Sequence, residues 1–407
     1  MVDTAKERPL SGYRVLDLTI ARAGPTAVRL LADWGADVIR IEPPITSGSN
    51  NSLSGAHEGS DQQNLHRNKR GLVIDLKHPK GSKLFKQMVA SADIVVENFR
   101  SDVKQRLGIE YKDLRRENRG IILASISGFG QTGPYQHRPG VDQIVQGSSG
   151  LMSVTGAPGG GPMRAGIAVS DTSAGMFLGQ GILLALLHRV KTGDGQWVHT
   201  SLLEAMMSKI DFQGSRYTMD GEIAEQEGNF HPTLAPMGMY SAKDGFVNLA
   251  ASSGKMWRNF CETLDAHKLL ENPLYAGGRA RFENRESLNR EVNALCQKFT
   301  MAELVDKLNA VGVPCGPINK ISEAFEDDQV QHLKMVKPAE HELLGKINLV
   351  RTPINLSLFP ETEQFVRAGP GPGQHSVEIL REFGLDEQSV RELIASGVVQ
   401  NNSIVPA

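Results

Sequence analysis

Apolar positions follow two different periods over the first half of the chain. Short apolar runs are separated by longer segments whose apolar residues recur at helical spacing. The short runs predict strands at residues 13–19, 37–42, 72–76, 92–97, 121–126 and 197–203, and the segments between them predict helices from Pro25 and at 81–89, 103–107 and 172–190. This alternation predicts an α/β fold, a doubly wound parallel sheet covered by helices on both faces. A ligand is then expected at the carboxyl ends of the strands.

The helix predicted at 172–190 is hydrophobic on nearly every side, which is the pattern of a buried helix. Lys191 and Gly193 follow it as a C-terminal stop. Asp171 comes directly before the helix, where backbone N–H groups point outward and the helix dipole favours an anion. An aspartate at this place is a preferred N-cap, and a partly solvated carboxylate is also a usable nucleophile. The residues alone leave both interpretations open.

The pattern changes near residue 220. A hairpin with Asp244-Gly245 at its turn is predicted at 239–247, and helical patterns follow it at 256–264, 285–299 and 301–311. We therefore predict an inserted, smaller α+β domain at residues 228–328. The large domain then comprises residues 1–220 and 329–407, and it ends in helices at 376–383 and 387–396.

Composition narrows the class of protein. The chain has 407 residues, 40% of them hydrophobic, and a formal net charge of -2, which gives no reason to expect nucleic acid or a membrane as partner. Its three cysteines are widely spaced, and its 11 histidines show no tight ligand spacing, so neither a disulfide framework nor a metal site is predicted. The opening residues have no apolar run and no later run suggests a membrane span, so a cytoplasmic protein is expected.

Polar residues gather in the loops expected at the strand ends. The first such loop, at 21–25, lacks the G-x-G-x-x-G pattern of a dinucleotide site, and residues 128–166 are rich in turn residues. A basic cluster of Arg67, Lys69 and Arg70, together with Lys77, fits either a groove for phosphates or a solvated basic face. The second interpretation is the more common one for such a cluster.

Six stretches of the sequence, one of them around Asp171, resemble the sequences of a known family. The stretch GIAVSDTSAGMFLGQGILLALLHRVKTGDGQWVHTSLLEA resembles the active-site stretch of the class III CoA-transferases (CaiB/BaiF type), which include formyl-CoA:oxalate, carnitine and succinyl-CoA:glutarate CoA-transferases. The others are LSGYRVLDLTIARAGPTAVRLLADWGADVIRIEPP, NLHRNKRGLVIDLKHPKG, ADIVVENFRSDVKQRLGIEY, ILASISGFGQTGPYQHRPGVDQIVQGSSGLMSVTG and GQHSVEILREFGLDEQSVRELIASGVV. The resemblance follows the family's order over nearly the whole chain.

The resemblance implies a Rossmann-like large domain, an interlocked homodimer and no permanently bound cofactor. It makes a coenzyme A thioester and a carboxylic acid the substrates, and we expect the acid to be a dicarboxylic one. It makes Asp171 the nucleophile, which passes through an acyl anhydride and an aspartyl-CoA thioester. The family's CoA contacts fall on Arg22, Ala23, Ile74, Asp75, Leu76, Lys77, Asn98, Phe99, Arg100, Arg106, Pro139, Gly140, Val141 and Asp142. The oxalate enzyme of the family has an arginine at Pro43, a lysine at Pro139 and a glycine-rich lid at 250–255, which this chain lacks.

Three other functions compete with the transferase. The α-methylacyl-CoA racemases are similar in sequence but take a proton with the histidine of a GHD motif, which here reads Gly140-Val141-Asp142. Valine cannot carry a proton, so the chemistry disfavours racemisation. A non-catalytic CoA-binding protein, in which Asp171 is only an N-cap, is the second alternative. An oxidoreductase on the Rossmann-like half is a weaker third, because the glycine fingerprint is missing.

Arg22 has two interpretations of its own. It could bind the distal carboxylate of a dicarboxylic substrate as a bidentate pair, or it could bind CoA or a neighbouring acid.

Overall fold

The computed structural model describes residues 8–44, 55–360 and 362–401. The contacts between residues divide the chain into two compact units. The first consists of Met1–Leu151, Ala165–Glu222 and Lys334–Ala407, and the second of Met152–Arg164 and Ile223–Leu333. The range predicted for the small domain, 228–328, lies within the second unit, and the second unit also takes in Met152–Arg164, a stretch that the prediction had left in the large domain.

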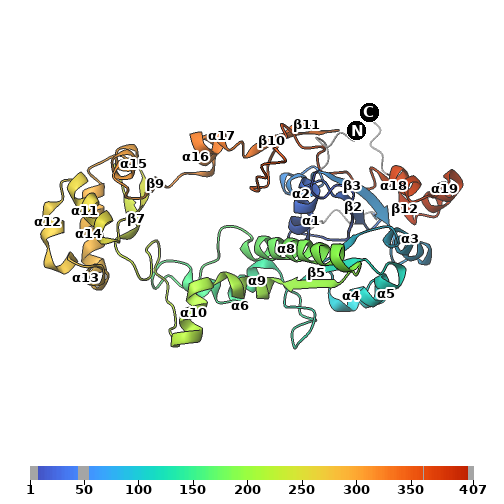
Figure 1. Ribbon diagram of the computed structural model, residues 1–407, viewed down its shortest axis with the longest axis horizontal. Helices are drawn as coiled ribbons and strands as arrows, with labels where there is room; N and C mark the ends of the chain where they lie inside the picture. The colour runs from blue at the N-terminus through green and yellow to red at the C-terminus, as the bar shows by residue number, and fades with distance from the viewer. Residues whose placement is uncertain (1–7, 45–54, 361, 402–407) are drawn as a thin grey trace. The chain divides into compact units, whose positions relative to one another are not determined.

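A seven-stranded sheet forms the centre of the first unit (Figure 1). Its order is β12-β3-β2-β1-β4-β5-β6, and every neighbouring pair is parallel except β12 with β3. The α/β class is confirmed, and the run 3-2-1-4-5-6 is the strand order found in dinucleotide-binding sheets. The strands are β1 (Arg14–Asp17), β2 (Asp37–Glu42), β3 (Lys69–Ile74), β4 (Ile94–Glu97), β5 (Ile122–Ser127), β6 (Trp197–Ser201) and β12 (Val399–Gln400).

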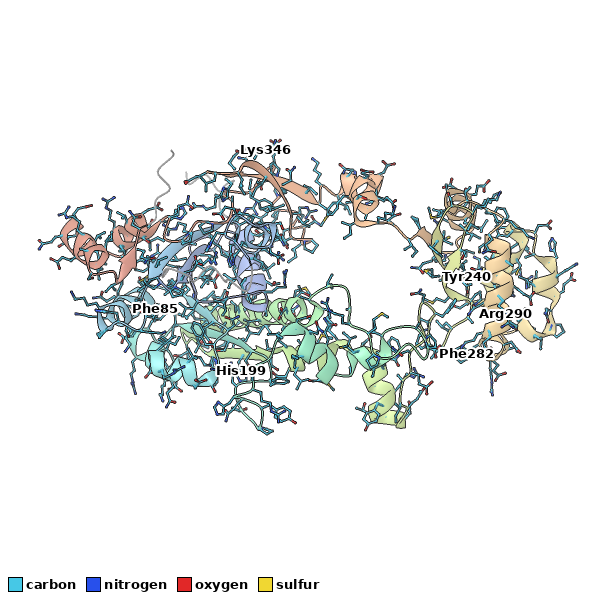
Figure 2. The ribbon with its side chains drawn as sticks, turned by 180° about the vertical axis from the view of Figure 1, so that it is seen from behind. Phe85, His199, Tyr240, Phe282, Arg290 and Lys346 are labelled. Atoms are coloured by element: carbon cyan, nitrogen blue, oxygen red, sulfur yellow. The ribbon has the colours of Figure 1, made fainter. Side chains whose placement is uncertain are left out.

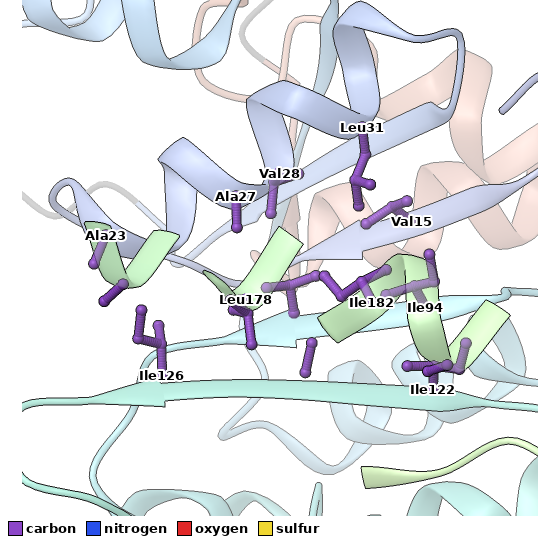
Figure 3. Packing of buried hydrophobic residues seen from close by; sticks show 14 of the residues in the cluster. Val15, Ala23, Ala27, Val28, Leu31, Ile94, Ile122, Ile126, Leu178 and Ile182 are labelled. Atoms are coloured by element: carbon purple, nitrogen blue, oxygen red, sulfur yellow. The ribbon is translucent and has the colours of Figure 1, made fainter. Parts of the chain in front are cut away.

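Helices cover both faces of this sheet because successive strand residues point to opposite sides. Val15 of β1 belongs to the core under α1 and α8, whereas the next residue, Leu16, belongs to the core under α3, α5, α18 and α19. Figure 3 shows the first of these cores, to which Val28 of α1 and Ile182 of α8 both belong. The helices are α1 (Ala23–Asp33), α3 (Pro79–Val89), α5 (Tyr111–Glu117), α8 (Val169–Thr192), α18 (Ser376–Glu382) and α19 (Glu387–Ala395).

The remaining elements of the first unit are short, and several of them were not predicted. The predicted strand at 197–203 ends at Ser201, because the Ser201 Oγ accepts a hydrogen bond of 3.0 Å from Glu204 N and caps the next helix. The short elements are α2 (Ser60–His66), α4 (Ser101–Leu107), α6 (Asp142–Ser148), α9 (Leu202–Lys209), α10 (Asp211–Asp220), and the antiparallel pair β10 (Val336–His341) and β11 (Gly345–Val350). A one-turn helix, α7 (Leu151–Val154), spans a boundary between the units.

The α8 helix is less buried than the sequence predicted. One side packs on α1 and the sheet through Leu178, Ile182 and Leu186, while the other side leaves Leu184 and Val190 67% and 73% exposed. Among the described residues, it is also the one helix whose length and hydropathy would suit a membrane span, contrary to the prediction that no run suggests one. Core helices of water-soluble proteins meet the same criteria, so this is weak evidence for a membrane.

The second unit has its own core around a three-stranded antiparallel sheet. Tyr240, labelled in Figure 2, is 1% exposed and donates its hydroxyl hydrogen bond to Asn289 Oδ1 at 2.7 Å. The predicted hairpin and helices are confirmed within small shifts. The elements are β7 (Met237–Ser241), β8 (Phe246–Ala250), β9 (Cys315–Pro317), α11 (Gly254–Thr263), α12 (His267–Glu271), η1 (Pro273–Tyr275), α13 (Gly278–Glu283), α14 (Arg285–Cys296), α15 (Met301–Ala310), α16 (Ile321–Glu326) and α17 (Asp328–His332).

Candidate active site

Close packing of α1 on α8 determines where Asp171 lies. Gly175 sits one turn after Asp171, and a Cβ at Gly175 would stand only 2.5 Å from the Ala23 carbonyl oxygen and 2.8 Å from Thr26 Cβ. The two helix backbones therefore meet at this point. Because residues four apart share one face of a helix, Asp171 lies on the face of α8 that is turned toward the start of α1.

Asp171 is not the N-cap of its helix. That position belongs to Ala168, and Asp171 is the third residue of α8. Among the described residues, none donates a hydrogen bond to the Asp171 carboxylate or forms an ion pair with it, although the side chain is partly buried. Burial, and secondly the nearby Asp142 carboxylate, raise the pKa of Asp171 to about 6, while Arg22 acts in the opposite direction. At neutral pH this side chain is an ionised and unusually basic carboxylate.

Arg22 lies at the N-cap position of α1 and forms an ion pair through its Nη2 with Asp61 Oδ2 of α2. The positive charge of Arg22 also lowers the pKa of Asp171. Of the two interpretations of Arg22, the contact seen here is the one with a neighbouring acid.

The loops that follow β1 and β4 meet at the centre of the sheet, where the strand order reverses. Ile20 N donates to Asn98 Oδ1 at 2.9 Å, and Asn98 Nδ2 donates to Ile20 O at 2.7 Å. In open α/β sheets, ligands bind in the crevice at this reversal. Asn98, Phe99 and the Arg22 loop therefore lie where the fold class binds its ligands.

Carboxylates at the strand ends hold three of these loops by the same contact. Asp17, Asp75 and Glu97 each accept a hydrogen bond from the backbone N–H two residues later, at 3.0, 3.0 and 2.7 Å. The last of these bonds orients Phe99, whose ring packs against the core under α3. The segment from Ile74 to Lys77 is turned in the same way, with Leu76 against that core and the Lys77 side chain exposed. These hydrogen bonds and apolar contacts fix the shape of the three loops.

The cations expected to meet phosphates lie at the surface of this edge. Arg100 and Arg106 flank Asp102 on α4, with Arg106 Nη2 at 3.2 Å and Arg100 Nε at 3.8 Å from its carboxylate. Within the described ranges, no hydrogen bond or ion pair joins Arg100, Arg106 or Lys77 to Asp171. They form a separate, exposed part of the candidate site.

The last predicted segment, Pro139 to Asp142, approaches the site from another direction. Val141 is the N-cap of α6, and its side chain is 57% exposed. Gly140 crosses Gly128 so closely that a Cβ on Gly140 would stand 2.7 Å from Gly128 Cα. Asp142, the first residue of α6, accepts hydrogen bonds from Ser170 N at 2.9 Å and from Asp171 N at 3.4 Å.

Both interpretations of the basic cluster at 67–70 are wrong. Lys69 is 0% exposed and 2.8 Å from Asp17, and Arg67 is 1% exposed and 2.6 Å from Asp33. Arg70 pairs with Asp37 and Glu382. Lys69 and Arg70 are buried because β3 begins at Lys69, three residues before the predicted strand, and Arg67, at the end of α2, is buried against Asp33.

Some residues of the site were missed in the sequence. Nothing there pointed to Asp61 as the partner of Arg22, or to Ser170 as a buried contact of Asp142. One signal was available, since Asp142 and Gln146 have the spacing of a helical pair, and Gln146 Nε2 does donate to Asp142 Oδ2 at 2.7 Å. The turn-rich composition of 128–166 concealed α6.

No group of three or more histidine, cysteine or acidic side chains able to hold a metal ion occurs in the described part of the chain.

Comparison with known proteins identifies the family. The model of CoA-transferase family III matches residues 10–376. The chain belongs to this family. It is 36% identical to the succinate–glutarate CoA-transferase of Agrobacterium fabrum, over 94% of this chain and 98% of that protein. It is 31% identical to the human succinyl-CoA:glutarate CoA-transferase, over 97% of this chain and 91% of that protein.

A solved structure agrees with this assignment. The CaiB/BaiF family protein from Brucella suis superposes with a TM-score of 0.82 at 30% identity, covering 93% of this chain and all of that one. The predicted family and enzyme class are therefore confirmed. The protein is a family III CoA-transferase, which moves CoA between acyl-CoA thioesters and carboxylic acids.

Proposed function

We propose that this enzyme transfers CoA through covalent intermediates on Asp171, with a dicarboxylic acid as acceptor. The observation that carries the proposal is the state of the Asp171 carboxylate. It is partly buried, has no hydrogen-bond or ion-pair partner among the described residues, and lies in the first turn of α8, where the helix dipole favours developing negative charge.

The reaction then proceeds in four acyl-transfer steps. An Asp171 oxygen attacks the thioester carbonyl of the donor, the C–S bond breaks, and CoA thiolate leaves a mixed anhydride. The thiolate attacks the Asp171 carbonyl carbon and displaces the donor acid, which gives an aspartyl-CoA thioester. The acceptor carboxylate displaces the thiolate from Asp171, and the thiolate then takes the acceptor's acyl group and frees Asp171. No net proton transfer is required, and activation is conserved while water is excluded.

The loops at the strand ends support CoA binding beside this carboxylate. We assign the CoA to the crevice edge that carries Asn98, Phe99 and the segment 74–77, with Arg106 and Lys77 as partners of its phosphates. Arg22 would bind the distal carboxylate of the acid, exchanging Asp61 for it. The names of the relatives support this class of acceptor, since glutarate is a dicarboxylate.

Trapping the covalent intermediate tests the proposal. Incubation with succinyl-CoA and borohydride or hydroxylamine, followed by peptide mass spectrometry, is expected to modify Asp171 in the wild type. Asp171→Ala should abolish transfer and labelling while CoA affinity stays within about twofold. The matched control is Asp328→Ala, because Asp328 is an exposed aspartate in the first turn of α17. Transfer activity retained in Asp171→Ala would refute the proposal.

Arg22→Met tests the choice of acid. Loss of a charge-assisted pair should raise the KM for a dicarboxylate acceptor about 10- to 100-fold and leave a monocarboxylate of similar length unchanged. Equal effects on the two acids would remove Arg22 from substrate recognition.

We also propose a homodimer, the interlocked form that the resemblance implies. The outer side of α8 supports it, because Leu184, Leu187 and Val190 expose 61–73% of their surface and an apolar face of this kind is typical of an interface. Light scattering of the purified protein should give twice the chain mass, and Leu187→Glu should shift the population to monomers. A monomeric wild type would contradict the proposal.

A further inference from the structure

The first turn of α8 is capped by another helix. Ala168, at the N-cap position, has no side chain that can accept a hydrogen bond. The acceptor is instead the Asp142 Oδ1 of α6, which receives Ser170 N at 2.9 Å and Asp171 N at 3.4 Å. A carboxylate in this place does the work of an N-cap side chain, since it satisfies backbone donors that the helix leaves unpaired.

The Asp142 carboxylate is itself held on both oxygens. Its Oδ1 also accepts from Ser170 Oγ at 2.6 Å, and its Oδ2 accepts from Gln146 Nε2 at 2.7 Å. Both of these partners are 0% exposed. Each oxygen of Asp142 is therefore directed into the protein.

Gln146 extends the same connection to the chain that leads into α8. Its Oε1 accepts from Ala165 N at 2.9 Å, and its Nε2 donates to Ile167 O at 3.2 Å. The approach to α8 and the first turn of α8 are consequently fixed to one short helix. The close crossing of Gly140 and Gly128 brings that helix to this place.

We infer that Asp142 is a positioning residue for Asp171, and that its side chain serves the nucleophile rather than CoA. The inference rests on the proposed function, because it assigns Asp142 a role in the covalent chemistry of Asp171. Asp142 accepts hydrogen bonds from the backbone N–H groups of Asp171 and of the residue before it. It thereby determines the direction in which the Asp171 side chain projects from the helix. Positioning of this kind matters because small displacements of a reacting group reduce the rate strongly.

The charge of Asp142 has a second effect on the same side chain. Asp142 raises the pKa of Asp171 and Arg22 lowers it, and Arg22 is in turn paired with Asp61. A more basic carboxylate is a better nucleophile, provided that it stays ionised at the working pH. A variant that removes the charge of Asp142 but keeps its shape should therefore separate its effect on the position of Asp171 from its effect on the pKa of Asp171.

Two substitutions at Asp142 test the inference. Asp142→Ala removes the cap and should lower kcat about 10- to 100-fold, with CoA affinity within about twofold of the wild type. Asp142→Asn keeps an acceptor oxygen, so it should retain more of the kcat. In the wild type, the rate of Asp171 labelling should be half-maximal near pH 6. In Asp142→Asn, the half-maximal rate should be reached at a lower pH. A residue needed only for folding would not move this midpoint.

Controls separate the possible outcomes. Gln143→Ala changes an exposed neighbour on α6 and should behave as the wild type. If Asp142→Ala does not fold, Gln146→Met tests the same contact one step further away and should also lower kcat without weakening CoA. Weaker CoA binding at unchanged kcat, or wild-type behaviour of both Asp142 variants, would overturn the inference. An Asp171→Ala variant that is still active would instead refute the proposed function.

Discussion

The buried ion pairs of Lys69 and Arg67 and the partly buried Asp171 carboxylate of α8 are held in opposite ways. Lys69 and Asp17 are 0% exposed and touch at 2.8 Å, and Arg67 and Asp33 form a second such pair. Asp171 is also partly buried, yet no cation contacts it within the described ranges. Burial lowers the pKa of Lys69 to about 8 and raises the pKa of Asp171 to about 6.

The difference separates structural charge from chemical charge. In a buried pair each ion neutralises the other, so neither is reactive. A buried ionised group without a partner keeps its reactivity and lowers the stability of the fold. The exposed cations at α4 are a third case, because among the described residues Arg106 forms an ion pair only with Asp102 of its own helix and can exchange this partner for a phosphate. Three substitutions probe this comparison.

The largest effect is expected at Lys69. Lys69→Met leaves Asp17 as a buried charge without its cation and should lower the free energy of unfolding by about 3–5 kcal/mol. Urea denaturation measures the change. The double variant with Asp17→Asn should recover part of it, because the stranded charge is then gone. A loss below about 1 kcal/mol would mean that the pair is not a structural one.

A smaller effect is expected at Arg106. Arg106→Ala should weaken CoA binding about tenfold, which is about 1.4 kcal/mol, and change the free energy of unfolding by less than about 0.5 kcal/mol. Calorimetric titration with CoA measures the affinity. The matched control is Arg116→Ala, since Arg116 is equally exposed and pairs with Asp113 on its own helix. Equal losses in both variants would show that Arg106 contributes only general positive charge.

The smallest effect is expected in the stability of an inactive variant. Asp171→Asn should raise the free energy of unfolding by about 1 kcal/mol, because it removes an ionised group that burial disfavours. This is less than the about 3 kcal/mol to which the pKa shift corresponds, since the partly buried amide of asparagine is itself disfavoured without a hydrogen-bond partner. The folded pKa lies above the unfolded one, so the native state loses stability as the pH rises from about 4 to 6, and the advantage of the variant grows over the same range. Thermal unfolding at several pH values checks this. An advantage that shrinks as the pH rises would contradict the unpaired state of Asp171.

The sequence predicted most of the sheet because its strands are buried on both faces and read as short apolar runs. It predicted β2 with its observed bounds, 37–42, and placed α8 within three residues at each end. It missed β12, a strand of two residues, which is too short to show any periodicity. The prediction for the burial of α8 was wrong, because an apolar helix pattern is the same whether its own chain or another molecule covers the helix.

The candidate site was predicted less completely, and for a physical reason. Asp171 could be singled out because a helix start is visible in the pattern, and the resemblance added the loops at the strand ends. The partners of these residues are separated from them in sequence by 39 positions for Arg22 and Asp61 and by 28 for Asp142 and Ser170. Such pairs depend on how the helices pack, and this packing cannot be predicted from the residue types along the chain.

The strand β12 has a consequence for the biosynthesis of the enzyme. It joins β3 near the end of the chain, and α18 and α19 complete one core of the sheet just before it. The large unit therefore stays unfinished during synthesis until Val399 and Gln400 have been added, which is after every residue of the second unit has been made. Truncation by a few tens of residues at the C-terminus would leave an open sheet edge and an uncovered apolar face, which are features that chaperones and proteases recognise.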